Sequence, residues 1–220
     1  MRLAILSDVH DHYDSLSKLL ARISKTHSPE LWVFTGDIGK EISLFNAVIN
    51  RLAEPQVVIY GNHDSEDIIK LDNRPRTWIL KFGEHVRIKD LTFLGIPGNR
   101  GSKSKWTHWT EDEVQKIIDL GEKVDVVVSH ECPLGVADFK NGAHSGQRIL
   151  RELIIKISPR LFVCGHIHAG IQCGRLMNTV VVNSGAVSYL DLSPPEYVIA
   201  DIGKEIVVRG FFNNISTKER

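Results

Sequence analysis

Carboxylates, histidines and one asparagine follow five short apolar runs of this sequence. The five polar groups are Ser7-Asp8-Val9-His10, Thr35-Gly36-Asp37, Gly61-Asn62-His63-Asp64, Ser129-His130 and Gly165-His166-Ile167-His168. One such group would be an ordinary turn, but five in one chain are typical of a metal or catalytic site. The remaining segments of the chain must therefore bring these five groups together.

Two of the groups contain a pair of polar residues two positions apart, Asp8 with His10 and His166 with His168. In extended backbone, side chains two positions apart point to the same side. Each pair can therefore bind one ion from two directions. The glycine directly before Asp37 lets the backbone turn tightly, so that the carboxylate faces the space beyond the strand.

The set contains two aspartates, one asparagine and four histidines, without His63. These donors are too many for one metal ion and suit two. Nitrogen and oxygen donors without cysteine favour manganese, iron, zinc or nickel over magnesium and calcium, which prefer oxygen ligands. A closed structural zinc site would instead use four ligands rich in cysteine. We expect two divalent metal ions, with manganese the first choice and iron, zinc, nickel or magnesium as alternatives.

Apolar, β-branched runs of strand length precede these groups and recur along the chain. They predict strands at Leu3–Leu6, Leu31–Phe34, Val57–Tyr60, Leu91–Leu94, Val124–Val128, Leu161–Cys164, Val180–Val182 and Val198–Ile202. Apolar residues at helical spacing predict helices over Ser15–Ile23, Thr110–Leu120 and Gln147–Ile157. Alternating strands and helices followed by a strand-rich half indicate an α/β sandwich with mixed sheets, a single domain over residues 1–220. Ligands in open α/β sheets bind beyond the carboxyl ends of strands, where all five polar groups lie.

The charge and the apolar content of the chain exclude several classes of protein. The 27 basic and 27 acidic residues give a net charge of zero, which argues against broad electrostatic capture of DNA or RNA. No apolar run is long enough to cross a bilayer, and the first run is too short for a signal peptide. Three cysteines do not suggest a disulfide framework, so we expect reduced thiols in a cytoplasmic protein. The last residues, 216–220, are expected to fray.

In chain order the motifs are D-x-H, G-D, G-N-H-D, H and G-H-x-H, and they extend from Asp8 to His168. This order resembles the calcineurin-like metallophosphoesterase superfamily, and within it the small microbial phosphodiesterases. The resemblance implies a four-layer α/β/β/α sandwich with a dinuclear metal site at its edge. It also implies the role of each matching residue: Asp8, His10 and His168 would hold one ion, Asn62, His130 and His166 would hold the other, Asp37 would bridge them, and His63 would face the substrate.

The donor set and the resemblance together imply hydrolysis of a phosphate ester. Two ions about 3.5–4 Å apart can share a hydroxide that attacks phosphorus in line with the leaving group. His63 would protonate the leaving oxygen or stabilise charge there, and it would contact the substrate together with Asn62. Asp64 follows directly and would orient the His63 ring. We expect a hydrolase that acts on small phosphodiesters more than on phosphomonoesters.

Other functions stay open from the sequence alone. Gly36-Asp37 is followed by Ile38 where the protein-phosphatase branch has a carboxylate, so a phosphoprotein substrate is disfavoured. A nuclease acting on DNA or RNA and a catalytically silent scaffold of the same fold are the two alternatives. Zero net charge weighs against the nuclease, and the complete ligand set weighs against the scaffold. The natural substrate, the metal pair and the presence of a homo-oligomer are not determined by the sequence.

Two weaker features lie outside the motifs. The basic, aromatic loop Gly98–Trp109 is either a lid, whose cations meet phosphate and whose rings stack on a base, or a solvated loop with its tryptophans packed on the core. His144 either reaches the site from its own loop or is a solvated loop histidine. Cys132 and Cys164 lie close to candidate ligands and are expected to be buried spacers.

Overall fold

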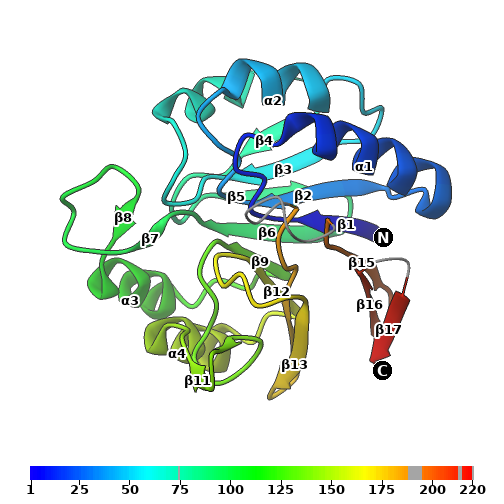
Figure 1. The fold of residues 1–220 in the computed structure, drawn as a ribbon. Helices are drawn as coiled ribbons and strands as arrows, with labels where there is room; N and C mark the ends of the chain where they lie inside the picture. Colours follow the sequence, from blue (N-terminus) through cyan, green and yellow to red (C-terminus); the bar gives the residue numbers. More distant parts are fainter. Residues whose placement is uncertain (74, 188–194, 213–214, 220) are drawn as a thin grey trace.

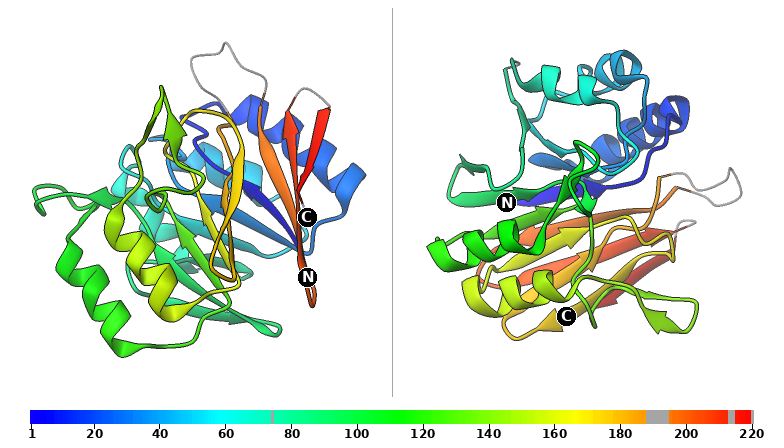
Figure 2. Two further views of the ribbon diagram at one scale, coloured as in Figure 1. Left: turned by 90° about the horizontal axis from the view of Figure 1, so that it is seen from below. Right: turned by 90° about the vertical axis from the view of Figure 1, so that its left-hand side faces the viewer.

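The computed structural model describes residues 1–73, 75–187, 195–212 and 215–219. Two β-sheets lie face to face, and helices cover the outer face of each sheet (Figure 1). The view from the left-hand side shows the same succession of helix, sheet, sheet and helix (Figure 2, right). The predicted four-layer α/β/β/α sandwich with two mixed sheets is therefore confirmed.

The first sheet has the strand order β17-β16-β15-β1-β2-β3-β4. Its strands are β1 (Arg2–Leu6), β2 (Leu31–Thr35), β3 (Gln56–Ile59), β4 (Thr77–Ile79), β15 (Tyr197–Ile202), β16 (Ile206–Phe212) and β17 (Ile215–Glu219). Strands β1 to β4 are parallel, whereas β15 joins β1 in antiparallel pairing and β16 and β17 continue in that way. The carboxyl ends of β1, β2 and β3 therefore lie at one edge of this sheet.

The second sheet has the strand order β13-β14-β12-β9-β6-β5. Its strands are β5 (His85–Ile88), β6 (Leu91–Ile96), β9 (Val126–Ser129), β12 (Leu161–Cys164), β13 (Gln172–Leu176) and β14 (Thr179–Asn183). Strands β6, β9, β12 and β14 are parallel, and the outer strands β5 and β13 are antiparallel to their neighbours. Two small two-stranded sheets lie within the loops: β7 (Asn99–Arg100) with β8 (His108–Trp109), and β10 (Phe139–Lys140) with β11 (Ala143–His144).

The outer layers consist of short helices. The first sheet is covered by α1 (Tyr13–His27), α2 (Ile42–Ile49) and the 3-10 helix η1 (Glu66–Asn73), and the second by α3 (Glu111–Leu120) and α4 (Arg148–Ile157). The three predicted helices correspond to α1, α3 and α4, with α1 extending beyond the predicted range at both ends, while α2 and η1 were not predicted from the sequence. In the described part of the chain, no helix is both long and apolar enough to cross a bilayer.

The core explains why the central strands are apolar on both faces. In β1, Ala4 and Leu6 pack against the layer of α1, whereas Leu3 and Ile5 pack between the two sheets. A third apolar cluster lies between the second sheet and the helices α3 and α4. Parallel strands that are buried on both faces are near-continuous apolar runs. Their polar residues are therefore confined to the strand ends.

Two expectations from the sequence are wrong. Residues 215–219 form strand β17 against β16 instead of a frayed tail, because an open edge of the sheet is available for pairing. Cys132 and Cys164 form a disulfide bond, with Cα atoms 5.3 Å apart, whereas reduced thiols were expected. Both cysteines are fully buried, as expected for spacers beside the candidate ligands. The cytoplasmic location stays a prediction.

We predict that Thr110→Ala lowers the free energy of unfolding by about 1 kcal/mol. The Glu113 carboxylate accepts hydrogen bonds from the main-chain N–H of Thr110 at 2.9 Å and from its hydroxyl at 3.1 Å, at the start of α3. For a chain of this size the melting temperature should fall by about 2–4 °C. Lys116→Ala, at an exposed position of the same helix, is the control. Equal melting temperatures of the two variants would contradict the capping role.

Candidate metal centre

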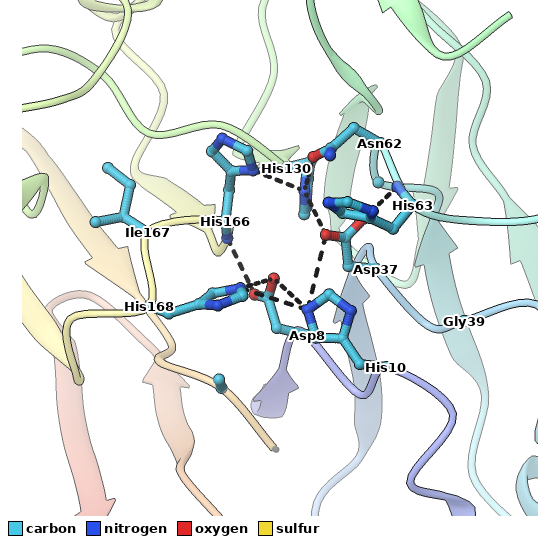
Figure 3. A network of polar contacts seen from close by, with 12 residues as sticks. Asp8, His10, Asp37, Gly39, Asn62, His63, His130, His166, Ile167 and His168 are labelled. Atoms are coloured by element: carbon cyan, nitrogen blue, oxygen red, sulfur yellow. Dashed lines mark hydrogen bonds and ion pairs between the residues drawn. The ribbon is translucent and has the colours of Figure 1, made fainter. Parts of the chain in front are cut away.

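The five predicted polar groups lie at the carboxyl ends of strands from both sheets. Strands β1, β2 and β3 deliver three of the groups, and β9 and β12 deliver the other two. The side chains from the two sheets converge on one small region (Figure 3). All seven candidate ligands are therefore brought together by the fold, together with His63.

The backbone turns sharply where the strands end. Four site residues have left-handed φ angles: Asp8 (55°), His10 (47°), Asp37 (51°) and His166 (64°). This conformation costs about 1–3 kcal/mol at most non-glycine residues, although aspartate and histidine adopt it more often than bulky residues. Main-chain bonds hold the turns, because the Asp37 carbonyl accepts from the N–H of Val9 at 2.8 Å and of His10 at 3.0 Å.

Glycine is required at two of these strand ends. A Cβ on Gly61 would lie 2.1 Å from Asp37 Oδ1, and a Cβ on Gly36 would lie 2.7 Å from His130 Nδ1. Gly36 also has a φ of 100°, which side chains rarely allow. The absence of a side chain at both positions lets the ends of β2 and β3 approach the carboxylate and the imidazole of the site.

A first cluster is formed by Asp8, His10 and His168. The Nε2 atom of His168 lies 2.7 Å from Asp8 Oδ1, and Nε2 of His10 lies 3.6 Å from the same oxygen. The two Nε2 atoms are 3.4 Å apart. Ligand atoms of these three residues lie within 4.8 Å of one another, which is the spacing of donors around one ion.

A second cluster is formed by Asn62, His130 and His166 together with Asp37. The Nε2 atom of His130 lies 3.1 Å from Asn62 Oδ1, 3.2 Å from His166 Nδ1 and 3.5 Å from Asp37 Oδ2. The other ring nitrogen, Nδ1, donates to the carbonyl of Thr35 at 2.8 Å. Because a carbonyl can only accept, this bond leaves Nε2 as the ring atom available to a metal ion.

Asp37 lies between the two clusters. Its Oδ2 is 3.5 Å from Nε2 of His130 in the second cluster and 3.8 Å from Nε2 of His10 in the first. Its other oxygen, Oδ1, accepts a hydrogen bond from the main-chain N–H of His63 at 2.9 Å. The carboxylate is almost completely buried. One oxygen atom of Asp37 thus faces both clusters.

The charge balance of the site fits bound cations. Burial alone would lower the pKa of His130, but the Asp37 carboxylate raises it to about 10. Burial lowers the pKa of His166 to about 4, and the charge on His130 acts in the same direction. Burial would raise the pKa of Asp8, yet contacts with His10 and His168 hold it well below its ordinary value. With Nδ1 of His130 bonded to Thr35, its Nε2 faces the other side chains of the cluster, and the ligand atoms present would suit two divalent ions.

His63 and Asp64 occupy different environments. The His63 ring is exposed and lies beside the first cluster, with its centroid 5.8 Å from that of the His10 ring. The Asp64 carboxylate is buried and accepts from the main-chain N–H of Gly39 and of Gly61, each at 2.7 Å. Burial, followed by repulsion from Asp37, raises the pKa of Asp64 to about 7. Both of its oxygens bind main chain, so we revise the expected contact with the His63 ring: Asp64 fixes the turns around the site.

The two weaker features of the sequence are resolved in part. Arg100 pairs with Glu111 at 3.1 Å and Lys103 with Glu113 at 2.9 Å, so these two loop cations bind helix α3. His144 belongs to neither cluster. Its Nδ1 lies 2.6 Å from the buried carboxylate of Asp138.

One residue that supports the site was not identified from the sequence. The Asp11 carboxylate accepts from the main-chain N–H of Lys40 at 2.7 Å and of Glu41 at 3.0 Å, and from the hydroxyl of Tyr13 at 2.8 Å. It joins the start of α1 to the segment that follows Asp37. The only signal in the sequence was its position directly after the D-x-H motif. Its partners are main-chain N–H groups, which do not depend on the residue type.

Known proteins share both the sequence pattern and the fold. Residues 1–205 match the family described as the calcineurin-like phosphoesterase superfamily domain. An uncharacterised protein of Methanocaldococcus jannaschii is 29% identical over 203 residues, which cover 84% of this chain and 86% of that protein. A probable glycerophosphodiester phosphodiesterase of Arcobacter nitrofigilis is 28% identical over 196 residues, covering 80% of this chain and 67% of that protein. A solved structure described as a novel archaeal phosphodiesterase has a TM-score of 0.63 and 19% identity, covering 96% of this chain and 99% of that one.

We predict that Asp37→Ala weakens binding of both metal ions, whereas His166→Ala weakens binding of one. Loss of an outer partner of a metal site typically weakens binding about 10–100-fold, and loss of a shared ligand should exceed this. Elemental analysis after dialysis against Mn²⁺ measures the number of bound ions. Asp112→Ala, at an exposed position of α3, is the control. Two tightly bound ions in the Asp37 variant would show that this residue does not bridge.

Proposed function

Because this chain belongs to the calcineurin-like phosphoesterase superfamily, and is therefore a hydrolase acting on ester bonds, we propose that it hydrolyses small phosphodiesters at the two clusters. The observation that carries this proposal is the position of Asp37 Oδ2, which faces a histidine of each cluster. Relatives named as phosphodiesterases support a diester over a monoester as substrate.

Two divalent ions bound at these clusters would activate a water molecule and polarise the phosphate ester. The protein's own contribution begins with the spacing of the donors, which Asp37 and the main-chain bonds of the strand ends fix before substrate binds. Asn62 directs its carbonyl oxygen toward His130, so its amide nitrogen can donate to a phosphate oxygen. Asn62 therefore supports both the second cluster and the orientation of the substrate.

His63 is suited to act on the leaving group. Its main-chain N–H is held by Asp37, and its ring is exposed beside His10 without being a member of either cluster. An imidazole in this position can donate a proton to the departing oxygen as the P–O bond breaks. It can also stabilise negative charge that develops there.

A small substrate agrees better with the chain than a polymeric one. The net charge is zero, whereas binding of DNA or RNA draws most of its affinity from cations that neutralise phosphates. Both clusters contain residues that can bind a metal ion, which favours an enzyme over a silent scaffold. Manganese is our proposal for the metal, because four imidazoles suit a borderline divalent ion.

Chelation should abolish hydrolysis of bis(p-nitrophenyl) phosphate, and Mn²⁺ should restore it better than Mg²⁺. Magnesium prefers oxygen ligands in octahedral geometry and keeps several waters, whereas the proposed ligands include four histidines. Initial rates of protein treated with EDTA and then supplied with each ion measure the effect. Full activity of protein shown by elemental analysis to be free of metal would contradict the proposed function.

We predict that His63→Ala retains both metal ions but loses about 10²–10⁴-fold in kcat on esters with an alkyl leaving group. An alkoxide needs a proton as it departs, whereas p-nitrophenolate is a stable anion and needs none. The loss should therefore be far smaller on a p-nitrophenyl ester. Asp64→Asn should reduce both activities alike, because Asp64 binds the main chain of Gly39 and Gly61.

The control for this experiment is His27→Ala, at the far end of the 15-residue helix α1. Equal losses of the His63 variant on both esters, with metal content intact, would leave only an electrostatic role for the ring. Loss of metal in that variant would place His63 among the ligands.

A further inference from the structure

We infer that Trp106, supported by Tyr60, forms a subsite for a planar ring of the substrate beside the second cluster. The inference rests on the proposed phosphodiesterase function and gives it a substrate class: small phosphodiesters in which one alcohol carries a nucleobase. Its basis is the loop of residues 97–109, which follows the carboxyl end of β6 and contains both small strands β7 and β8.

The loop is attached to both chain segments that supply the second cluster. On one side, the N–H of Gly98 donates to the carbonyl of Tyr60 at 2.7 Å, and Tyr60 is two residues before Asn62. On the other side, the N–H of Arg100 donates to the buried carboxylate of Glu131 at 2.7 Å, directly after His130. Since Asn62 and His130 contact each other at 3.1 Å, the base of the loop is attached to both chain segments that meet in the second cluster.

The lower part of the loop has little freedom to move. The N–H of Asn99 donates to the carbonyl of Thr107 at 3.1 Å, and the N–H of Gly101 donates to that of Trp109 at 2.9 Å. Gly98 has a φ of 71°, and a Cβ there would lie 1.8 Å from the Thr107 carbonyl oxygen. Trp109 is only 1% exposed and anchors the end of the loop in the core beside α3.

Two cations of the loop bind helix α3. Arg100 and Lys103 are paired with Glu111 and Glu113 of α3. These ion pairs draw the two positive charges toward the helix. Of the two tryptophans of the loop, Trp106 is the one that is exposed.

Trp106 differs from Trp109 in its exposure. Its side chain is 39% exposed, although burial of an indole in the core would be favourable. The ring lies against the buried Tyr60 ring, with centroids 4.6 Å apart and planes inclined by 44°. Contact with Tyr60 supports the indole, and part of its surface remains open to solvent. An aromatic surface supported in this way stacks with a base at a small entropic cost. Stacking does not depend on the identity of the base, so the surface suits any nucleobase.

The test compares two substrates that differ only in the base: the methyl ester of uridine 5′-phosphate and the methyl ester of ribose 5-phosphate. Hydrolysis by the Mn²⁺-loaded protein is followed by phosphorus NMR. Trp106→Ala should raise KM for the uridine ester about 5- to 100-fold, because stacking of one base contributes a binding free energy of this size. The value of kcat should stay nearly unchanged. KM for the ribose ester should not change. Trp106→Phe should restore most of the affinity, and Lys116→Ala, at an exposed position of α3, is the control.

The outcomes separate this inference from the proposed function. Hydrolysis of neither ester by the wild-type protein, together with inactivity on bis(p-nitrophenyl) phosphate, would overturn the proposed function and the inference with it. Hydrolysis of both esters with equal KM would overturn the subsite alone. Equal changes of KM on both esters in Trp106→Ala, or a loss of bound metal, would show that the indole only supports the loop.

Discussion

The carboxylate and the main chain of Asp37 form the interaction on which this site depends. The carbonyl of Asp37 accepts two N–H groups from the turn after β1, and its Oδ1 accepts the N–H of His63 after β3. Its Oδ2 faces His10 and His130, which belong to different clusters. A single residue at the end of β2 therefore joins the ends of its two neighbouring strands and sets the separation between the clusters. Any displacement of β2 along the sheet would disturb both clusters at once.

The candidate metal ligands lie close together, and without a cation several of them repel one another. Asp8 and Asp37 are buried, and the ring nitrogens of His130 and His166 face each other at 3.2 Å. Burial of unpaired charge is strongly unfavourable. Divalent ions at the two clusters would offset the carboxylate charges and engage several of these side chains at once. The left-handed turns and close glycines bring the backbone, as well as the side chains, into this compact arrangement.

The sequence predicts those parts of the molecule that are governed by local pattern. The apolar runs of strand length predicted the central strands, and the polar residues at their ends predicted which side chains meet. Helix α2 escaped prediction because its eight residues, Ile42–Ile49, are apolar on most faces and show no clear helical stripe. The partners of Asp64 and Asp11 were also missed or misassigned, because main-chain N–H groups carry no signature in residue types. The disulfide was not foreseen, although Cys132 and Cys164 each lie two positions from a candidate ligand of the same ion, because three cysteines in this chain were interpreted as reduced thiols.

The residues of the two clusters and the residues of the surrounding loops are held in place by different parts of the structure. The clusters are built on strand ends, which the buried cores on both faces of each sheet hold in place. The loops around them are attached through fewer contacts, and Glu131 joins two of these loops. Its buried carboxylate accepts from the N–H of Arg100 at 2.7 Å and from the side-chain amide of Gln147 at 2.8 Å. Because Glu131 directly follows His130, both loops are positioned relative to a candidate ligand. Residues farther out on these loops can therefore change without moving the clusters, so that one arrangement of ligands can serve different phosphoesters.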